Sequence, residues 1–141
     1  MQFEKPAFAE TFPYGIKNER IRKWIVGSML GGDSGAAGLP GNPWPSLAQL
    51  VQLSGRVRRR LALVRSPCLI VHSSDDDIAS LRNVALLEAG VAAPLEKVLL
   101  DDSYHMVTVD QQRDLVVARS AAFFGRIAAE GVPAAGKMAA A

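Results

Sequence analysis

The sequence has very little cysteine, because Cys68 is the only one among 141 residues. A single cysteine excludes a disulfide within the chain and a cysteine-rich zinc site, and it fits a reducing compartment. Long apolar runs are also absent, since no stretch approaches the roughly 20 apolar residues of a membrane-spanning helix. The first ten residues include Glu4, Lys5 and Glu10 and do not resemble a secretory signal peptide. We therefore expect a cytoplasmic protein without a membrane span.

Charge of one sign is not in large excess, and histidine is scarce. The formal net charge is +2, which is too small by itself to indicate a nucleic-acid partner. Charged residues make up 21% and hydrophobic residues 49% of the chain, proportions typical of one packed globular domain. His72 and His105 are the only histidines, so chemistry that needs an imidazole has two candidates.

The apolar pattern predicts helices first and an alternation of strands and helices afterwards. The expected elements are a helix over 16–30, a Gly/Pro-rich loop over 31–45, a helix from Ser46 to about residue 65, a strand over 67–72, a helix over 81–88 capped by Ser80, a strand over 95–100, and a last helix opened by a capping box at 108–111. The second half is then a βαβ unit, which implies an α/β fold with a parallel sheet. Two parallel strands make a poor sheet, so the sequence looks like part of a larger doubly wound fold.

Polar side chains follow both predicted strands. Three consecutive aspartates, 75–77, come after the first strand, and His105 comes after the second. Neighbouring parallel strands lie about 4.8 Å apart, so an aspartate of one loop can reach a histidine of the next. Such an aspartate would orient the imidazole and leave its other nitrogen free as a general base. We expect Asp101 and Asp102 to be solvated or to support the histidine loop.

Two stretches resemble a known family. "PCLIVHSSDDDIAS" is similar to the strand and acid turn of the α/β-hydrolase fold, and "LLDDSYHMVTVDQQRDLV" is similar to its last strand, histidine loop and final helix. The resemblance is to the carboxylesterase, monoacylglycerol-lipase and serine-aminopeptidase-like group. It places Asp76 at the acid position, His105 at the base position and Asp110 at the start of the last helix. Asp75 and Asp77 stay open as alternative acids.

The same resemblance implies a division of the chain and a substrate pocket. Residues 1–13 would be an extended N-terminal segment, 14–66 a helical cap, 67–129 the C-terminal part of the hydrolase core, and 130–141 a flexible tail. The resemblance also makes the aromatic residues of this cap candidates for lining an acyl pocket, because such pockets are mostly apolar. The candidates are Trp24, Trp44 and Tyr14, with Phe12 beside them.

The sequence departs from the family at the nucleophile. No G-x-S-x-G motif occurs anywhere in the chain. The nearest match, Gly32-Asp-Ser-Gly35, lies in a Gly/Pro-rich loop, so we interpret Ser34 as an ordinary loop residue. The resemblance therefore implies a serine hydrolase of carboxylic esters in which this chain supplies the acid and base, the nucleophile is missing, and no metal or cofactor is needed.

Two other classes of function stay open on the sequence. The aspartates at 75–77 could hold Mg²⁺ in a metal-dependent or phosphate-handling α/β domain, although no Gly-rich phosphate loop is present. The chain could instead be a non-catalytic interaction module. In either hydrolase or module, the apolar strand at 67–72 predicts an exposed sheet edge that binds a missing N-terminal half or a second copy of the chain.

Overall fold

The computed structural model describes residues 7–9, 11–31 and 41–130. Its elements in chain order are β1 (Ala7–Ala9), α1 (Glu19–Leu30), β2 (Gly41–Pro43), α3 (Trp44–Arg58), a 3₁₀ turn η1 (Leu61–Leu63), β3 (Cys68–Ser73), α4 (Arg82–Gly90), β4 (Leu95–Leu100) and α5 (Arg113–Glu130). Ser34 and residues 131–141, nearly all of the expected tail, lie outside the described residues.

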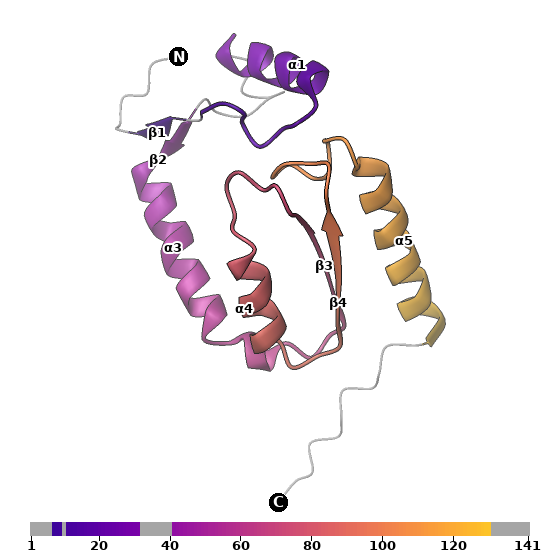
Figure 1. Ribbon diagram of the computed structural model, residues 1–141. Coiled ribbons are helices and arrows are strands. Elements are labelled where there is room, and N and C mark those ends of the chain that lie inside the picture. The colour runs from indigo at the N-terminus through magenta and orange to yellow at the C-terminus, as the bar shows by residue number, and fades with distance from the viewer. Residues whose placement is uncertain (1–6, 10, 32–40, 131–141) are drawn as a thin grey trace, which may run out of the picture.

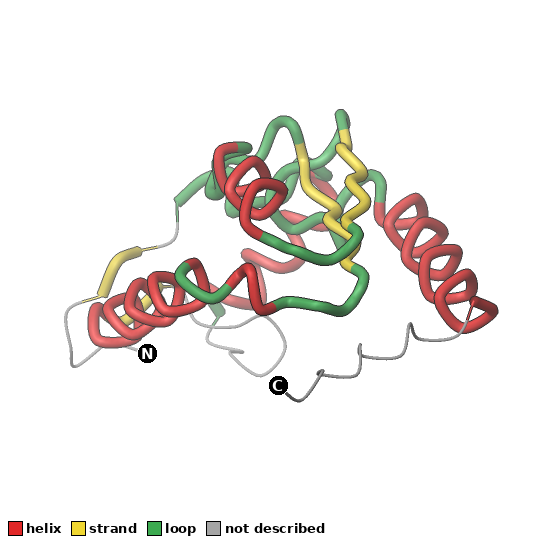
Figure 2. Tube along the Cα trace, turned by 90° about the horizontal axis from the view of Figure 1, so that it is seen from below, coloured by secondary structure: helices red, strands yellow, loops and turns green. Residues whose placement is uncertain are grey.

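The expected βαβ unit is present in the second half of the chain (Figure 1). β3 and β4 pair in parallel, from Cys68 opposite Leu95 to Ser73 opposite Leu100. α4 joins the two strands, and α5 runs back beside the sheet and contacts β3. Figure 2 shows the two strands between α4 and α5. β4 has the predicted bounds, while β3 begins and ends one residue later than predicted.

A small core lies around this unit. Its fully or almost fully buried apolar residues are Ile16, Met29, Leu61, Val84, Leu100, Val116 and Phe123. β4 ends in Leu100, which is completely buried, whereas the apolar residues of β3 are only partly covered. β3 is less covered than an interior strand of a larger parallel sheet, because β4 is its one strand neighbour among the described residues.

The Gly/Pro-rich loop predicted over 31–45 was wrong in its last part. Gly41–Pro43 form the short strand β2, which pairs antiparallel with β1. α3 then begins at Trp44, with Pro45 in its first turn, where a missing backbone N–H costs the helix nothing. The helix also ends earlier than expected, at Arg58, and Leu61–Leu63 form a separate 3₁₀ turn.

The capping box predicted at 108–111 is not formed. α5 begins only at Arg113, and the backbone N–H of Gln112 donates to Ser103 Oγ at 3.2 Å. The Asp110 side chain is buried and accepts hydrogen bonds from more distant residues instead. α1 does have a side-chain cap, since Asn18 Oδ1 accepts from the backbone N–H of Ile21.

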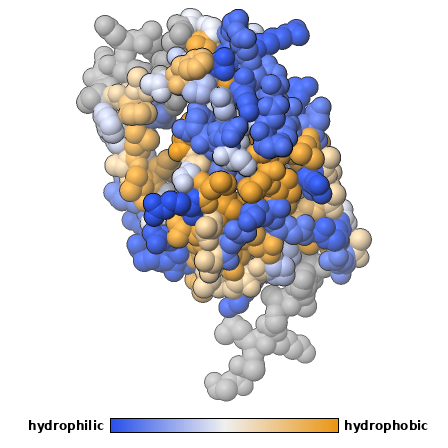
Figure 3. Space-filling model, in the orientation of Figure 1, coloured by the Kyte–Doolittle hydropathy of each residue, from blue (hydrophilic) through white to orange (hydrophobic). Residues whose placement is uncertain are grey.

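Large apolar side chains are exposed along the helices. α3 has no buried residue, and Leu50, Val51, Leu53 and Val57 on it are each at least half exposed. Figure 3 shows hydrophobic side chains at the surface along the α3 side and in the middle of this face. In the part of the chain that the structure describes, no helix is both long and apolar enough to cross a membrane.

Candidate active site

Asp76 and His105 meet where the two parallel strands end. Asp76 lies in the loop after β3, and its Oδ2 and Oδ1 are 2.9 and 3.1 Å from Nδ1 of His105, in the loop after β4. The contact expected between the two strand-end loops is present. Because a carboxylate only accepts, His105 Nδ1 donates, and its Nε2 is left to accept a proton. The His105 side chain is 40% exposed, which leaves room for a reacting group.

The Asp76 carboxylate is held in place by its own loop. Its side chain is 5% exposed, and Oδ1 accepts from the backbone N–H groups of Ile78 at 2.9 Å and Ala79 at 2.6 Å. Burial acts to raise the pKa of Asp76, but the hydrogen bonds from Ala79, His105 and Ile78 outweigh it and hold the pKa below the ordinary 3.8. Asp76 is therefore ionised at neutral pH, as an orienting carboxylate must be.

The loop that carries His105 rests on the turn before α1. Gly15 has a φ of 70°, and a Cβ at that position would lie 3.0 Å from Cβ of His105. The backbone N–H of Met106 donates to the Gly15 carbonyl at 2.7 Å. Asp77 Oδ2 accepts from the Gly15 N–H at 3.1 Å, and its Oδ1 lies 3.4 Å from the backbone nitrogen of His105. A residue without Cβ thus lets the turn approach the histidine.

Asp110 fixes the other side of the same loop. Its carboxylate is 1% exposed and accepts three backbone N–H groups, from Tyr104 at 2.7 Å, Lys17 at 2.8 Å and Asn18 at 2.7 Å. Tyr104 precedes His105, and Lys17 and Asn18 lead into α1. One buried carboxylate therefore joins the histidine loop to the segment before α1.

The remaining acidic residues of the two loops face a common cation. Lys17 Nζ is 3.1 Å from Asp75 Oδ2 and 3.1 Å from Asp102 Oδ1. Hydrogen bonding to Asp102 and then to Asp75 raises the pKa of Lys17. Asp75 is thus paired with a lysine and Asp77 with backbone amides, so among 75–77 only Asp76 contacts the imidazole of His105. Asp102 was expected to be solvated or to support the histidine loop, and its side chain is both 57% exposed and paired with Lys17.

Two serines also connect the strand ends. Ser73 and Ser103 are both completely buried, and Ser73 Oγ donates to the backbone carbonyl of Ser103. Ser73 Oγ accepts in turn from the backbone N–H of Asp75 at 3.1 Å. The hydroxyl therefore links the loop that carries the acid to the loop that carries the base.

The three aromatic candidates for a substrate pocket have different surroundings. Trp24 is 66% exposed and borders a groove of about 490 Å³ lined mainly by polar residues at the starts of α1 and α5. Trp44 is 52% exposed and packs edge-on against Phe8, with ring centroids 6.0 Å apart. Tyr14, at a φ of 60°, directly precedes Gly15 and so lies beside the histidine loop. A role in binding an acyl group stays a prediction for all three.

The magnesium alternative finds no geometric support. The carboxylates of 75–77 point to separate partners, as described above, and the residues that the structure describes contain no group of three or more His, Cys, Asp or Glu side chains that could hold a metal ion. His72 and Gly15 lie beside the candidate dyad, and sequence reasoning gave neither a role there. Asp77 was predicted only as an alternative acid and Asp110 only as a helix-start residue, whereas both bind backbone N–H groups around the histidine loop. The adjacent Tyr14–Gly15 turn was the one visible local signal.

The fold has a solved counterpart. The chain superposes with a TM-score of 0.67 and 26% sequence identity on a structure from work on LipS and LipT, two metagenome-derived lipolytic enzymes. The match covers 89% of this chain and 46% of that one. The chain therefore has the C-terminal portion of the α/β-hydrolase fold, as the sequence predicted.

A curated relative points to the same group. The chain is 29% identical over 85 residues to a thermostable monoacylglycerol lipase of Bacillus sp. (strain H-257). The aligned region covers 60% of this chain and 34% of that enzyme. No family model matches the chain. The chain is thus related to lipases and esterases of the α/β-hydrolase fold, and it spans about a third of the length of this curated relative.

Proposed function

We propose that this chain supplies the orienting acid Asp76 and the general base His105 to a serine hydrolase of carboxylic esters. The observation that carries the proposal is the hydrogen bond from His105 Nδ1 to the buried Asp76 carboxylate at the carboxyl ends of two parallel strands. Open α/β sheets gather their active sites at that edge. The likeness to two kinds of lipolytic enzyme supports an ester as substrate.

The chemistry follows from the fixed tautomer of His105. With its proton held on Nδ1 by Asp76, His105 Nε2 removes the proton of an attacking serine hydroxyl and later returns it to the leaving alcohol. Asp76 stabilises the imidazolium that forms between these steps. The sequence offers no G-x-S-x-G turn, so the serine and the N–H donors for the oxyanion must come from a segment outside these residues.

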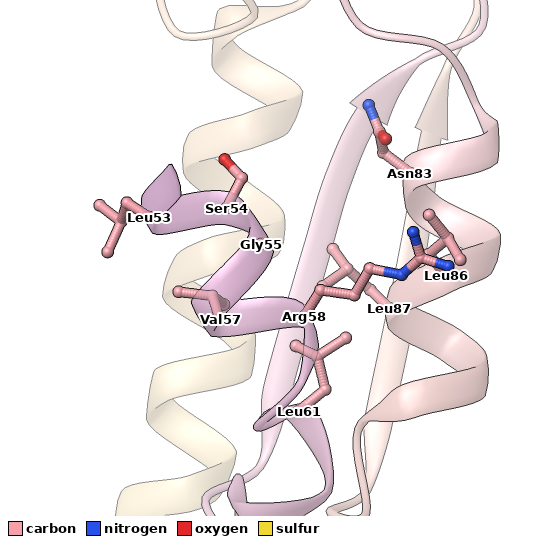
Figure 4. Close-up of a pocket in the computed structure, with 9 residues that line it drawn as sticks. All are labelled: Leu53, Ser54, Gly55, Val57, Arg58, Leu61, Asn83, Leu86 and Leu87. Carbon is pink, nitrogen blue, oxygen red and sulfur yellow. The ribbon is translucent and has the colours of Figure 1, made fainter. Parts of the chain in front are cut away.

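Exposed features of the chain favour a binding partner that completes the sheet. β3 and β4 have no other strand neighbours among the described residues, and α3 buries none of its side chains. Between α3 and α4 lies an apolar groove of about 520 Å³, where Arg58 reaches toward Leu86 and Leu87 (Figure 4). We infer that the front half of an α/β-hydrolase fold, carrying the nucleophile, covers these surfaces.

Hydrolysis of p-nitrophenyl acyl esters tests the proposal. The isolated chain should be no faster than buffer with free imidazole, because acyl transfer needs the serine and the oxyanion donors. Adding a front half that carries G-x-S-x-G, in cis or as a second chain, should restore turnover. In that enzyme His105→Ala should lower kcat roughly 10³-fold or more.

Asp75→Asn is the matched control, because its carboxylate pairs with Lys17 and should matter far less than that of Asp76. Rapid turnover by the isolated chain, unchanged in His105→Ala, would contradict the assignment. A cytoplasmic location also stays a prediction, for which cell fractionation is the measurement.

A further inference from the structure

A second histidine lies near the same Asp76 oxygen, Oδ2, that His105 contacts. His72 lies near the end of β3, and its side chain is only 14% exposed. Its Nδ1 is 2.7 Å from the carbonyl oxygen of Ser73, and since a carbonyl only accepts, Nδ1 carries a proton. Its Nε2 is buried without a hydrogen-bond partner among the described residues and lies 3.6 Å from Asp76 Oδ2.

The protonation state of His72 decides whether this contact is favourable. With Nδ1 protonated, a neutral His72 ring presents the lone pair of Nε2 to a carboxylate oxygen, so that two acceptors face one another. A doubly protonated ring presents an N–H instead, and a shift of a few tenths of an ångström brings the atoms within hydrogen-bond distance. Buried polar groups without partners are rare, which favours the donating form.

We propose that His72 is a positioning residue that donates from Nε2 to Asp76 Oδ2 and so holds the carboxylate against His105. Among the described residues, the titratable groups near it are the Asp76 carboxylate and the His105 ring, which contacts the same Asp76 oxygen. His72 would touch neither substrate nor the reacting atoms. The catalytic importance of His72 rests on the proposed function, whereas the hydrogen bond from His72 to Asp76 does not.

The hydrogen bond can be tested by NMR on the isolated, histidine-labelled chain. We expect ¹⁵N spectra to show His72 protonated at both ring nitrogens when the low-field proton of His105 Nδ1–H is sharpest. If His72 keeps an unprotonated Nε2 wherever the His105 resonance is observed, the proposal is overturned.

Matched variants separate positioning from folding. His72→Gln keeps a side-chain N–H donor and should retain the His105 resonance, whereas His72→Leu should increase its exchange rate roughly ten-fold. In the completed enzyme, His72→Leu should lower kcat roughly ten-fold with little change in KM, and His72→Gln should recover most of it. Equal behaviour of the two variants would refute positioning. If the NMR results are as expected but the chain completed with a front half hydrolyses no ester, the proposed function is refuted and the hydrogen bond of His72 is not.

Discussion

The Asp76 carboxylate is almost completely removed from water and yet stays ionised. Three donors make this possible, namely two backbone N–H groups of its own loop and the imidazole of His105. Each favours the charged form, and together they exceed the cost of burial. The same donors fix the direction of the carboxylate, so the electrostatics and the geometry of the dyad have one origin.

The lowered pKa of Asp76 makes a prediction for stability against pH. An acid whose pKa is lower in the folded chain stabilises the fold fully above its unfolded value of 3.8 and loses that contribution as the pH falls through the folded pKa. The difference in unfolding free energy between the wild-type chain and Asp76→Asn should therefore be largest above about pH 5 and shrink towards pH 2. Urea unfolding across this range measures it.

Asp114→Asn is the control for this experiment, because the Asp114 side chain is 94% exposed. The free energy of unfolding of Asp114→Asn should differ little from that of the wild-type chain at every pH. A difference for Asp76→Asn that is constant with pH would mean that the carboxylate has no lowered pKa in the folded chain.

Asp110 gives a second prediction at the same scale. Asp110→Ala leaves three backbone N–H groups without their acceptor in a buried place, and should lower the free energy of unfolding by about 3 kcal/mol or more. Urea denaturation is the measurement, with Asp114→Ala expected to change it by less than about 0.5 kcal/mol. Equal losses in the two variants would show that the Asp110 contacts contribute little.

At the scale of elements, the site depends on the turn before α1 as much as on the two strands. Gly15 combines a left-handed φ with close contact to His105, so a side chain there is unfavourable on both grounds. Gly27 lies within α1, where an added Cβ meets nothing within 4 Å. The two glycines therefore form a matched pair for the same substitution.

Gly15→Ala should destabilise the chain by about 1–3 kcal/mol and shift the backbone resonances of the His105 loop. Gly27→Ala should stabilise it by about 0.5–1 kcal/mol, because alanine is the better helix former. Thermal unfolding followed by circular dichroism, with NMR shifts for the loop, distinguishes the two. A stabilising Gly15→Ala would mean that the turn does not support the histidine loop.

At the scale of the whole molecule, the small core and the exposed α3 go together. The parallel sheet has two strands in the described part of the chain and offers little area for helices to cover, so the apolar side chains of α3 stay at the surface. The isolated chain should consequently self-associate. Sedimentation at several protein concentrations should show an average mass that rises with concentration.

Substituting Val51→Lys and Leu53→Lys together should reduce this association, since both side chains are more than half exposed on α3. Gln49→Lys with Gln52→Lys adds the same charge without removing apolar surface and should reduce it less. A chain that stays monomeric at high concentration would contradict the inference that the exposed apolar surface of α3 binds a partner.

The sequence by itself determined the types and order of the elements in the βαβ unit. Apolar runs and helical periodicity are local properties, so β3, α4, β4 and α5 could be read from neighbouring residues. It also placed an acidic cluster and a histidine at the ends of adjacent strands, where a parallel sheet must bring them together. The predicted helix starts were wrong at α3, which begins at Trp44 with Pro45 in its first turn, and at α5, which begins at Arg113. Near the start of α5, the Asp110 side chain accepts hydrogen bonds from residues far away in the sequence, which a local pattern does not show.

Only the tertiary structure decided which aspartate faces the histidine and what supports the pair. The family resemblance placed Asp76 at the acid position but left Asp75 and Asp77 open, because the three aspartates are consecutive. Their different partners depend on loops and on the turn at Gly15, which lie far apart along the chain. Asp110 and His72 act, or are proposed to act, through contacts with the same loops. Such contacts depend on how whole elements pack, and no local pattern of residues determines that packing.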